Sequence, residues 1–184
     1  MNILGISAGF HDASATVVNR QGDILFAGHS ERYSKVKNDP ALHPALLAEL
    51  CEWEYDTVAF YERPWLHNLQ QLYTGQRAFG PWTTQGAIRK HLGSWYKHPA
   101  NFEHSYSHHL SHAAAGFQTS PFHSATVVVI DAIGEFDTIS IYGAHYVNGR
   151  AEYHRLWRQS YPNSIGLFYS AMTAEVGLKP MEEE

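Results

Sequence analysis

The 184-residue sequence has little cysteine and no long apolar run. Its one cysteine, Cys51, has no partner for an internal disulfide, and this usage favours a reducing compartment, so we expect a cytoplasmic protein. No run of about 18 apolar residues occurs, so we expect no membrane span. The opening segment MNILGISAGFHD lacks a basic stretch, so we expect no signal peptide.

Positive charge is also scarce. The 13 Lys and Arg residues are outnumbered by 18 Asp and Glu residues, which gives a net charge of −5. This balance argues against a dominant nucleic-acid-binding surface, because such surfaces carry clustered Lys and Arg. Hydrophobic residues make up 44% of the chain, which is typical of globular proteins and excludes global disorder.

Histidine, by contrast, is abundant. The chain has 13 His, as many as Lys and Arg together, and four of them lie between residues 104 and 112. Histidine binds metal ions and moves protons near neutral pH. We interpret the scattered histidines as surface residues and the 104–112 cluster as a candidate site.

Hydrophobic patterning predicts a mixed α/β protein. Apolar runs predict strands at residues 2–7, 13–18, 24–28, 56–61, 102–106, 125–130, 137–145 and 151–157. Helical spacing predicts helices at residues 40–55, 62–71, 83–97, 107–117 and 163–177. The polar segment 30–39 predicts a loop, Asn148-Gly149 predicts a hairpin turn, and Ser107 is a predicted helix cap.

A weak internal repeat emerges from this pattern. Three strands followed by a helix occur over residues 2–54 and again over residues 124–176. Each copy opens with a strand that leads into a glycine-bearing turn with an acid, GFHD at 9–12 and DAIGE at 131–135. Such turns present backbone N–H groups to phosphate oxygens in a nucleotide cleft, although both also fit ordinary hairpins. The aliphatic run ATVVVI at 125–130 predicts a strand buried on both faces, as at the centre of an α/β sheet.

The pair His108 and His112 carries the clearest chemical signal. Residues four apart on a helix lie on one face, where two imidazoles can bind one divalent metal ion. Position 109 is His109 rather than the glutamate of zinc proteases, so that class is disfavoured. Asp131, at the end of a predicted buried strand, is the first candidate for a further ligand, with Glu135, Asp137 and Asp12 in reserve. Taken alone, the pair also fits a histidine-rich helix that caps a loop.

Five segments together resemble the O-carbamoyltransferases of nodulation-factor and antibiotic biosynthesis. In chain order they are GISAGFHDASATVV (5–18), SERYSKVKND (30–39), SHHLSHAAAGFQTSPF (107–122), VVVIDAIGEFDTISIYG (127–143) and SIGLFYSAMTAEVGLKP (164–180). Those enzymes belong to the actin-like, sugar-kinase and Hsp70 superfamily, and their fold is similar to that of tRNA threonylcarbamoyl transferases. The resemblance implies an α/β protein with an actin-like or ribonuclease H-like first lobe at residues 1–120 and the start of a second similar lobe at 121–184.

The resemblance also implies an activity. Such enzymes move a carbamoyl group from carbamoyl-adenylate to a hydroxyl of a small molecule or nucleoside, and they depend on a metal and on ATP. The adenylate comes from carbamoyl phosphate and ATP on a second, YrdC-like domain. The implied metal is iron-like, and two histidines with a carboxylate also suit zinc and manganese.

The resemblance assigns roles by motif. His108, His112 and Asp131 would hold the metal, and His11 and Asp12 would sit near the carbamoyl or phosphate groups, with His11 as general base. The remaining assignments are to the nucleotide and phosphates: Lys35, Lys37, Gly134 and Glu135. Taken alone, His11 also fits a polar turn, the two lysines a solvated loop, and Glu135 an exposed hairpin carboxylate.

Two departures from the family pattern matter. Ala132 stands where the family turn has a glycine, and its Cβ can crowd a phosphate. The chain stops soon after the first helix of the second lobe, so we expect a second chain that completes the fold, or self-association. Two alternatives to O-carbamoyl transfer stay open: a non-catalytic binding or assembly module of the same fold, and threonylcarbamoyl transfer to tRNA.

Overall fold

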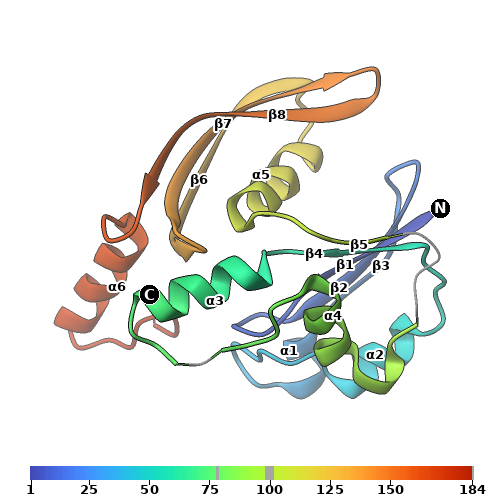
Figure 1. Cartoon of the computed structure of the whole chain (residues 1–184), viewed down its shortest axis with the longest axis horizontal. Coiled ribbons are helices and arrows are strands. Elements are labelled where there is room, and N and C mark those ends of the chain that lie inside the picture. The colour runs from blue at the N-terminus through green and yellow to red at the C-terminus, as the bar shows by residue number, and fades with distance from the viewer. Residues whose placement is uncertain (78, 98–101, 184) are drawn as a thin grey trace. The chain divides into compact units, whose positions relative to one another are not determined.

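The computed structural model describes residues 1–77, 79–97 and 102–183, which form a mixed α/β protein (Figure 1). The chain divides into two compact units, Met1–Tyr106 and Ser107–Glu184. This division lies before the predicted lobe boundary at 120/121, because helix α5 (His108–Gln118) packs against strands β6 and β7 of the second unit. The lobe boundary of the family fold stays a prediction.

The first unit is built on a five-stranded sheet with the order β3-β2-β1-β4-β5. Strands β1 to β3 are antiparallel, and β4 and β5 run parallel to β1. The bounds are β1 Asn2–Ser7, β2 Ser14–Asn19, β3 Ile24–His29, β4 Thr57–Phe60 and β5 Phe102–Ser105. This order is that of a ribonuclease H-like sheet, as the resemblance implied, and each strand lies within one or two residues of its predicted range.

Helices α1, α2 and α4 lie on one side of this sheet (Figure 1). The helices of the unit are α1 Ser30–Ser34, α2 Pro44–Leu50, α3 Pro64–Tyr73 and α4 Thr84–Leu92, with a 3₁₀ turn at Gly93–Trp95. The core joins alternate residues of the central strands, such as Leu4 and Val58, to the buried faces of α2 and α4, such as Leu46 and Ile88. The alternating apolar residues of the strands therefore pack against the helically spaced apolar residues of the helices.

Three predictions in this unit were wrong in extent. Segment 30–39 begins with helix α1 instead of being a loop throughout, because residues 30–34 close one helical turn that ends at Lys35 with a left-handed φ of 58°. The helix predicted at 40–55 starts only at Pro44, whose fixed φ suits a first turn, and His43 caps it by accepting a hydrogen bond from Ala45 N. The helix predicted at 83–97 stops at Leu92, where Gly93 adopts a φ of 54°.

The second unit contains a three-stranded antiparallel sheet with the order β6-β7-β8. Its elements are α5, β6 Ser124–Gly134, β7 Asp137–Val147, β8 Arg150–Ser160 and α6 Ile165–Glu175. Helix α5 covers one face of the sheet, where Ala113 packs with Val129 and Tyr142. The predicted turn Asn148-Gly149 joins β7 and β8 with φ values of 50° and 76°, as a tight hairpin requires.

Strand β6 differs from its prediction. In the described chain it is an edge strand, and Val128 and Ile130 are each 55% exposed, so it is not buried on both faces. It also continues through the predicted turn as far as Gly134. The aliphatic run has one face against α5 and an open face on which Val128, Ile141 and Trp157 are register neighbours.

The internal repeat predicted from the sequence is confirmed. Strands β1, β2 and β3 precede α1 and α2 in the first unit, and β6, β7 and β8 precede α6 in the second. Among the described residues, no helix has the length and apolar content needed to cross a membrane.

Candidate metal centre

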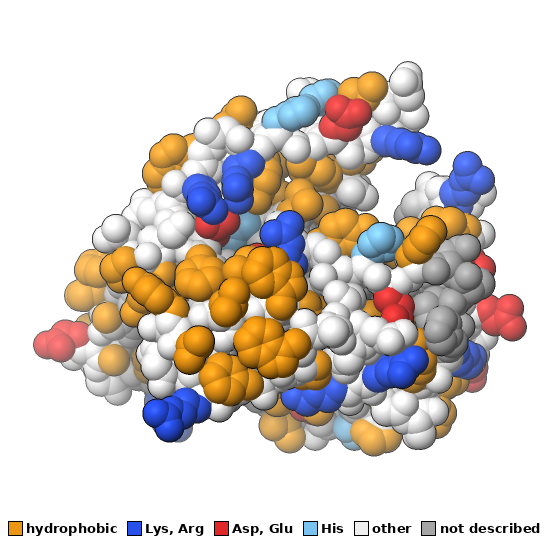
Figure 2. Space-filling model, viewed as in Figure 1, with side chains coloured by type: hydrophobic (Ala, Val, Ile, Leu, Met, Phe, Trp, Pro, Cys, Tyr) orange, Lys and Arg blue, Asp and Glu red, His pale blue; other side chains and the backbone are white. Residues whose placement is uncertain are grey.

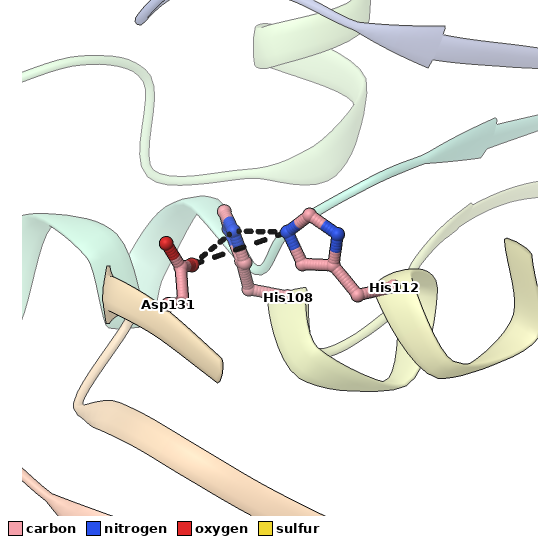
Figure 3. Close-up of side chains that lie close together, drawn as sticks. All are labelled: His108, His112 and Asp131. Atoms are coloured by element: carbon pink, nitrogen blue, oxygen red, sulfur yellow. Dashed lines mark hydrogen bonds and ion pairs between the residues drawn. The ribbon is translucent and has the colours of Figure 1, made fainter. Parts of the chain in front are cut away.

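Two histidines and an aspartate converge in the second unit (Figure 3). His108 and His112 project from one face of α5, and Asp131 lies near the end of β6. His108 Nε2 lies 3.0 Å from Asp131 Oδ2 and 3.1 Å from His112 Nε2. The third edge, from His112 Nε2 to Asp131 Oδ2, is 3.9 Å. The structure thus brings together the three residues predicted as first metal ligands.

These distances fit a shared divalent metal ion. Donors about 2.0–2.2 Å from a tetrahedral ion lie about 3.4 Å from one another, close to the three observed edges. The set is two imidazole nitrogens and one carboxylate oxygen, which suits iron, zinc and manganese. Of the reserve ligands in this unit, Asp137 pairs with Arg155 and Arg158, and Glu135 is not in the cluster, whereas Asp12 belongs to the first unit.

Asp131 carries a negative charge at neutral pH. Burial acts to raise its pKa, but the hydrogen bond and the charge of His108, with the Ala132 N–H and His112, lower that pKa to about 2. The Ala132 N–H donates to Asp131 Oδ1 at 2.6 Å. The carboxylate is therefore available as a negatively charged ligand.

The start of α5 places His108. Ser107 is the residue before the helix and has extended φ and ψ, as predicted for a cap. Its side chain makes no capping hydrogen bond, so Ser107 occupies the cap position without capping the helix through its side chain. Gly134, on the neighbouring β6, faces this first turn: a Cβ there would lie 2.6 Å from His108 Cδ2 and 2.7 Å from His109 Cδ2. Glycine is needed at 134 because the imidazoles occupy the space of a side chain.

We expect Gly134→Ala to displace the first turn of α5 and weaken metal binding. Overpacking of this kind costs about 1–3 kcal/mol of folding free energy. The matched control is Gly143→Ala on β7, where the nearest atom would be 3.8 Å from the new Cβ. Urea unfolding and zinc titration of both variants check this. Equal stability and equal zinc affinity in the two variants would show that the close contact is unimportant.

A serine and a glycine at the start of α6 hold the Asp131 end of β6, and sequence reasoning missed them. Ser164 Oγ donates to the Ala132 carbonyl at 2.7 Å and accepts from Leu167 N at 3.1 Å, so it caps α6 and ties it to β6. A Cβ on Gly166 would lie 2.6 Å from Ala132 N. The one sequence signal was Ser164 itself, a residue type common before the first turn of a helix, at the second position of the helix predicted at 163–177.

His109, the residue after His108 in helix α5, is buried. It is 1% exposed, its Nδ1 is 2.8 Å from Ser140 Oγ, and its Nε2 has no hydrogen-bond partner within the described residues. Burial lowers the pKa of His109 below its ordinary value, against the opposing charges of Asp131 and Asp137. His109 therefore packs beneath helix α5 as a buried structural residue, and its imidazole is neutral near pH 7.

This burial predicts a pH-dependent stability. In the unfolded chain His109 takes up a proton below about pH 6.5, whereas in the folded chain its lowered pKa keeps the imidazole neutral to lower pH. The free energy of unfolding is therefore highest above pH 6.5 and decreases as the pH falls below it. One such group costs at most about 1.4 kcal/mol per pH unit. Urea unfolding at pH 7.5 and 5.5 should show a smaller decrease for His109→Gln than for wild type, with exposed His123→Gln as control. The same decrease in both variants would contradict the assignment.

The first unit gathers a different group at the β1–β2 turn. His11 Nδ1 lies 2.7 Å from Asp12 Oδ2, and His29 Nε2 lies 3.7 Å from Asp12 Oδ1. Asp12 has a left-handed φ of 54°, which sets this carboxylate between the two imidazoles. Sequence reasoning missed His29, although the β2–β3 register, with Ser14 opposite His29, is what brings it to the turn.

The loop that contains Lys35 and Lys37 and continues to Pro40 lies beside the β1–β2 turn. Gly9 N donates to the Pro40 carbonyl and Ala13 N to the Asp39 carbonyl, each at 2.9 Å. These two N–H groups are therefore not directed at a phosphate, contrary to the general expectation for the turn. Lys35 and Lys37 are exposed, and Lys35 Nζ donates to the Arg32 carbonyl at 2.6 Å.

The second turn has a buried acid. Glu135 is 8% exposed and has a left-handed φ of 59°, so the alternative of an exposed hairpin carboxylate is wrong. Ala132 lies within β6 and its φ is not in the left-handed region, so its Cβ causes no backbone strain.

A cavity of about 100 Å³ adjoins the first turn and was not predicted. Its wall includes Gly9, and also Glu62 and His67, whose Oε2 and Nδ1 atoms lie 3.3 Å apart. His91 also lines it, and burial lowers the pKa of this histidine. Its lining comes from segments far apart in the sequence, which explains why no local pattern indicated it.

The family model described as "Carbamoyltransferase N-terminus" matches residues 73–184, more than half of the chain and all of the metal cluster. The chain belongs to this carbamoyltransferase family.

Two relatives extend over nearly the whole chain. An uncharacterized protein of Synechocystis sp. is 31% identical over 97% of the chain and 32% of its own length. An uncharacterized protein of Methanocaldococcus jannaschii is 28% identical over 99% of the chain and 31% of its own length. The chain thus spans about a third of the length of these relatives.

A solved structure with some similarity is a ROK family protein from Streptococcus pneumoniae, in complex with sucrose. It is 18% identical and covers 83% of this chain and 48% of its own, with a TM-score of 0.34. This similarity is too low to carry an argument, and the fold assignment depends on the strand order of the first unit.

Proposed function

We propose that the chain is the metal-binding N-terminal part of an O-carbamoyltransferase. It would move a carbamoyl group from carbamoyl-adenylate, formed from carbamoyl phosphate and ATP, to a hydroxyl of a small-molecule or nucleoside acceptor in the cytoplasm. The observation that carries this proposal is the cluster of His108, His112 and Asp131, whose donor atoms lie 3.0–3.9 Å apart in a family of carbamoyltransferases.

In this proposal the cluster holds one divalent ion, with iron as the first choice and zinc or manganese as substitutes. A bound ion acts as a Lewis acid that stabilises negative charge on carbamoyl or phosphate oxygens. His108 and His112 contribute neutral nitrogens, and Asp131, with its pKa lowered to about 2, contributes a charge that partly neutralises the ion.

His11 is the proposed general base. Asp12 Oδ2, 2.7 Å from His11 Nδ1, orients the imidazole and stabilises the protonated ring, which leaves Nε2 to receive a proton. The acceptor hydroxyl gives its proton to Nε2, and its oxygen forms a bond to the carbamoyl carbon. The bond between that carbon and the adenylate phosphate oxygen breaks, and AMP leaves.

The remaining assignments concern charge around the nucleotide. Lys35 and Lys37, exposed beside the first turn, are proposed to neutralise phosphate. Gly134 and Glu135 are proposed to lie near the nucleotide at the second turn. The Ala132 N–H already donates to Asp131, so we assign it to positioning the metal ligand rather than to binding phosphate.

Further polypeptide is proposed to cover the open face of the second unit. Helix α6 is apolar on most sides, and its exposed residues include Ile165, Phe168, Tyr169, Met172 and Val176. A helix of this kind is normally buried. The open sheet face with Val128 and Trp157 adds to the apolar surface. We propose that a second chain, or a second copy of this one, completes the fold there.

The test is carbamoyl transfer from radiolabelled carbamoyl phosphate with ATP and a panel of sugars, nucleosides and tRNA. The chain is assayed alone and with the remaining two thirds of the Synechocystis relative supplied as a separate polypeptide, and His112→Ala is the matched control. Labelled small-molecule product that disappears with His112→Ala supports the proposal. Labelled tRNA supports threonylcarbamoyl transfer when threonine is required. Metal binding without transfer in any mixture favours a binding module.

A further inference from the structure

A second cluster of metal-binding side chains lies on the long β7–β8 hairpin, away from the α5–β6 cluster in the fold. His145 on β7 is the register partner of Glu152 on β8, and His154 lies two residues further along β8. Residues two apart on a strand point to the same face, as do register partners on neighbouring strands. The hairpin therefore presents two imidazoles and one carboxylate on a single face, and Figure 2 shows histidine and acidic side chains close together over it.

The distances place the three side chains within reach of one ion. One donor atom from each lies within 4.8 Å of the others, and His154 Nε2 is 3.9 Å from Glu152 Oε2. The rings of His145 and His154 stack, with centroids 5.5 Å apart and planes inclined by 19°. A tetrahedral ion requires donors about 3.4 Å apart. His154 and Glu152 are 66% and 49% exposed, so rotation of their side chains meets no packed core.

We propose that His145, Glu152 and His154 form a second divalent metal site that binds zinc. Two imidazoles and one carboxylate favour zinc, copper or nickel over magnesium and calcium, which prefer oxygen ligands. The site's exposure leaves a fourth position for water. This proposal does not depend on the carbamoyltransferase activity.

The position on the sheet gives the ion a structural role. The register of β7 with β6 ends at the pair Ser124 and His145, and beyond it the hairpin continues as two strands to the Asn148-Gly149 turn. A two-stranded hairpin is at best marginally stable. An ion at His145, Glu152 and His154 joins the two strands where the third strand ends, and so resists fraying of the tip.

The experiment is a calorimetric titration of the purified chain, first stripped of metal, with zinc chloride. We expect two zinc ions per wild-type chain, one in His154→Ala and one in the double variant His108→Ala/His112→Ala. Adding His154→Ala to that double variant should weaken the remaining binding by more than about tenfold, since even loss of an outer hydrogen-bond partner costs that much at metal sites. Exposed His123→Ala, in the same unit, should change nothing.

Amide hydrogen exchange gives an independent readout. Zinc should slow exchange of the hairpin amides near residues 146–150 in the double variant His108→Ala/His112→Ala and leave it unchanged when His154→Ala is added. The hairpin site would be overturned if that double variant bound no zinc. It would also be overturned if adding His154→Ala left the zinc affinity of the double variant unchanged. One zinc in wild type and none in His154→Ala would support the hairpin site while counting against the α5–β6 centre.

Discussion

Replacing His112 with alanine should empty the α5–β6 metal centre while leaving the fold intact. His112 is 56% exposed, so its removal opens no cavity in the core, and His108 and Asp131 remain as an incomplete pair. Loss of one of three ligands should weaken binding by more than about tenfold. Carbamoyl transfer, where assayed, should fall by about 100-fold or more, because the ion supplies several kcal/mol and each 1.36 kcal/mol is a factor of ten.

The measurement is metal content by mass spectrometry beside circular dichroism of the same sample. His123→Ala is the matched control, since His123 is exposed in the same unit and belongs to neither cluster. If a folded His112→Ala protein retained its metal affinity, the histidine pair of α5 would not be a metal-binding pair. Loss of metal in both variants would instead indicate a general effect of histidine removal.

Replacing Gly166 with alanine should be the most destabilising of the small substitutions. The new Cβ would lie 2.6 Å from Ala132 N, 2.7 Å from Ala132 Cα and 2.8 Å from Asp131 C. These are backbone atoms of β6 and cannot rotate away, so helix α6 must shift. Overpacking usually costs about 1–3 kcal/mol and occasionally more, and we expect a loss at or above about 3 kcal/mol.

Gly116→Ala is the matched control for this prediction. Gly116 lies in helix α5, and a Cβ there meets nothing within 4 Å. Alanine in place of glycine inside a helix gains about 1 kcal/mol, so this control should be more stable than wild type. Urea unfolding checks both. A Gly166→Ala protein as stable as wild type would mean that the close approach of α6 to β6 does not exist in solution.

The metal cluster could largely be predicted from local patterns. The spacing of His108 and His112 is read directly from helical periodicity, and Asp131 follows an aliphatic run whose end is a common site position. What the spacing leaves open is whether the helix faces that strand end. The contact depends on the small Gly134 and on packing of Ala113 against Val129.

Features that depend on strand register and on distant segments escaped prediction. His29 joins His11 and Asp12 only because Ser14 pairs with His29 across β2 and β3. Ser164 reaches Ala132 across 32 residues of sequence. A continuous aliphatic run predicts burial on both faces, yet β6 is an edge strand within the described chain, because the sequence cannot state which neighbours a strand has.

The central claim is that His108, His112 and Asp131 together bind one metal ion. Anomalous diffraction from crystals grown with iron or zinc tests it most directly. We expect a peak about 2.0–2.2 Å from His108 Nε2, His112 Nε2 and Asp131 Oδ2. A well-ordered α5–β6 region without a peak, in crystals whose solution contains a saturating amount of the ion, would contradict it.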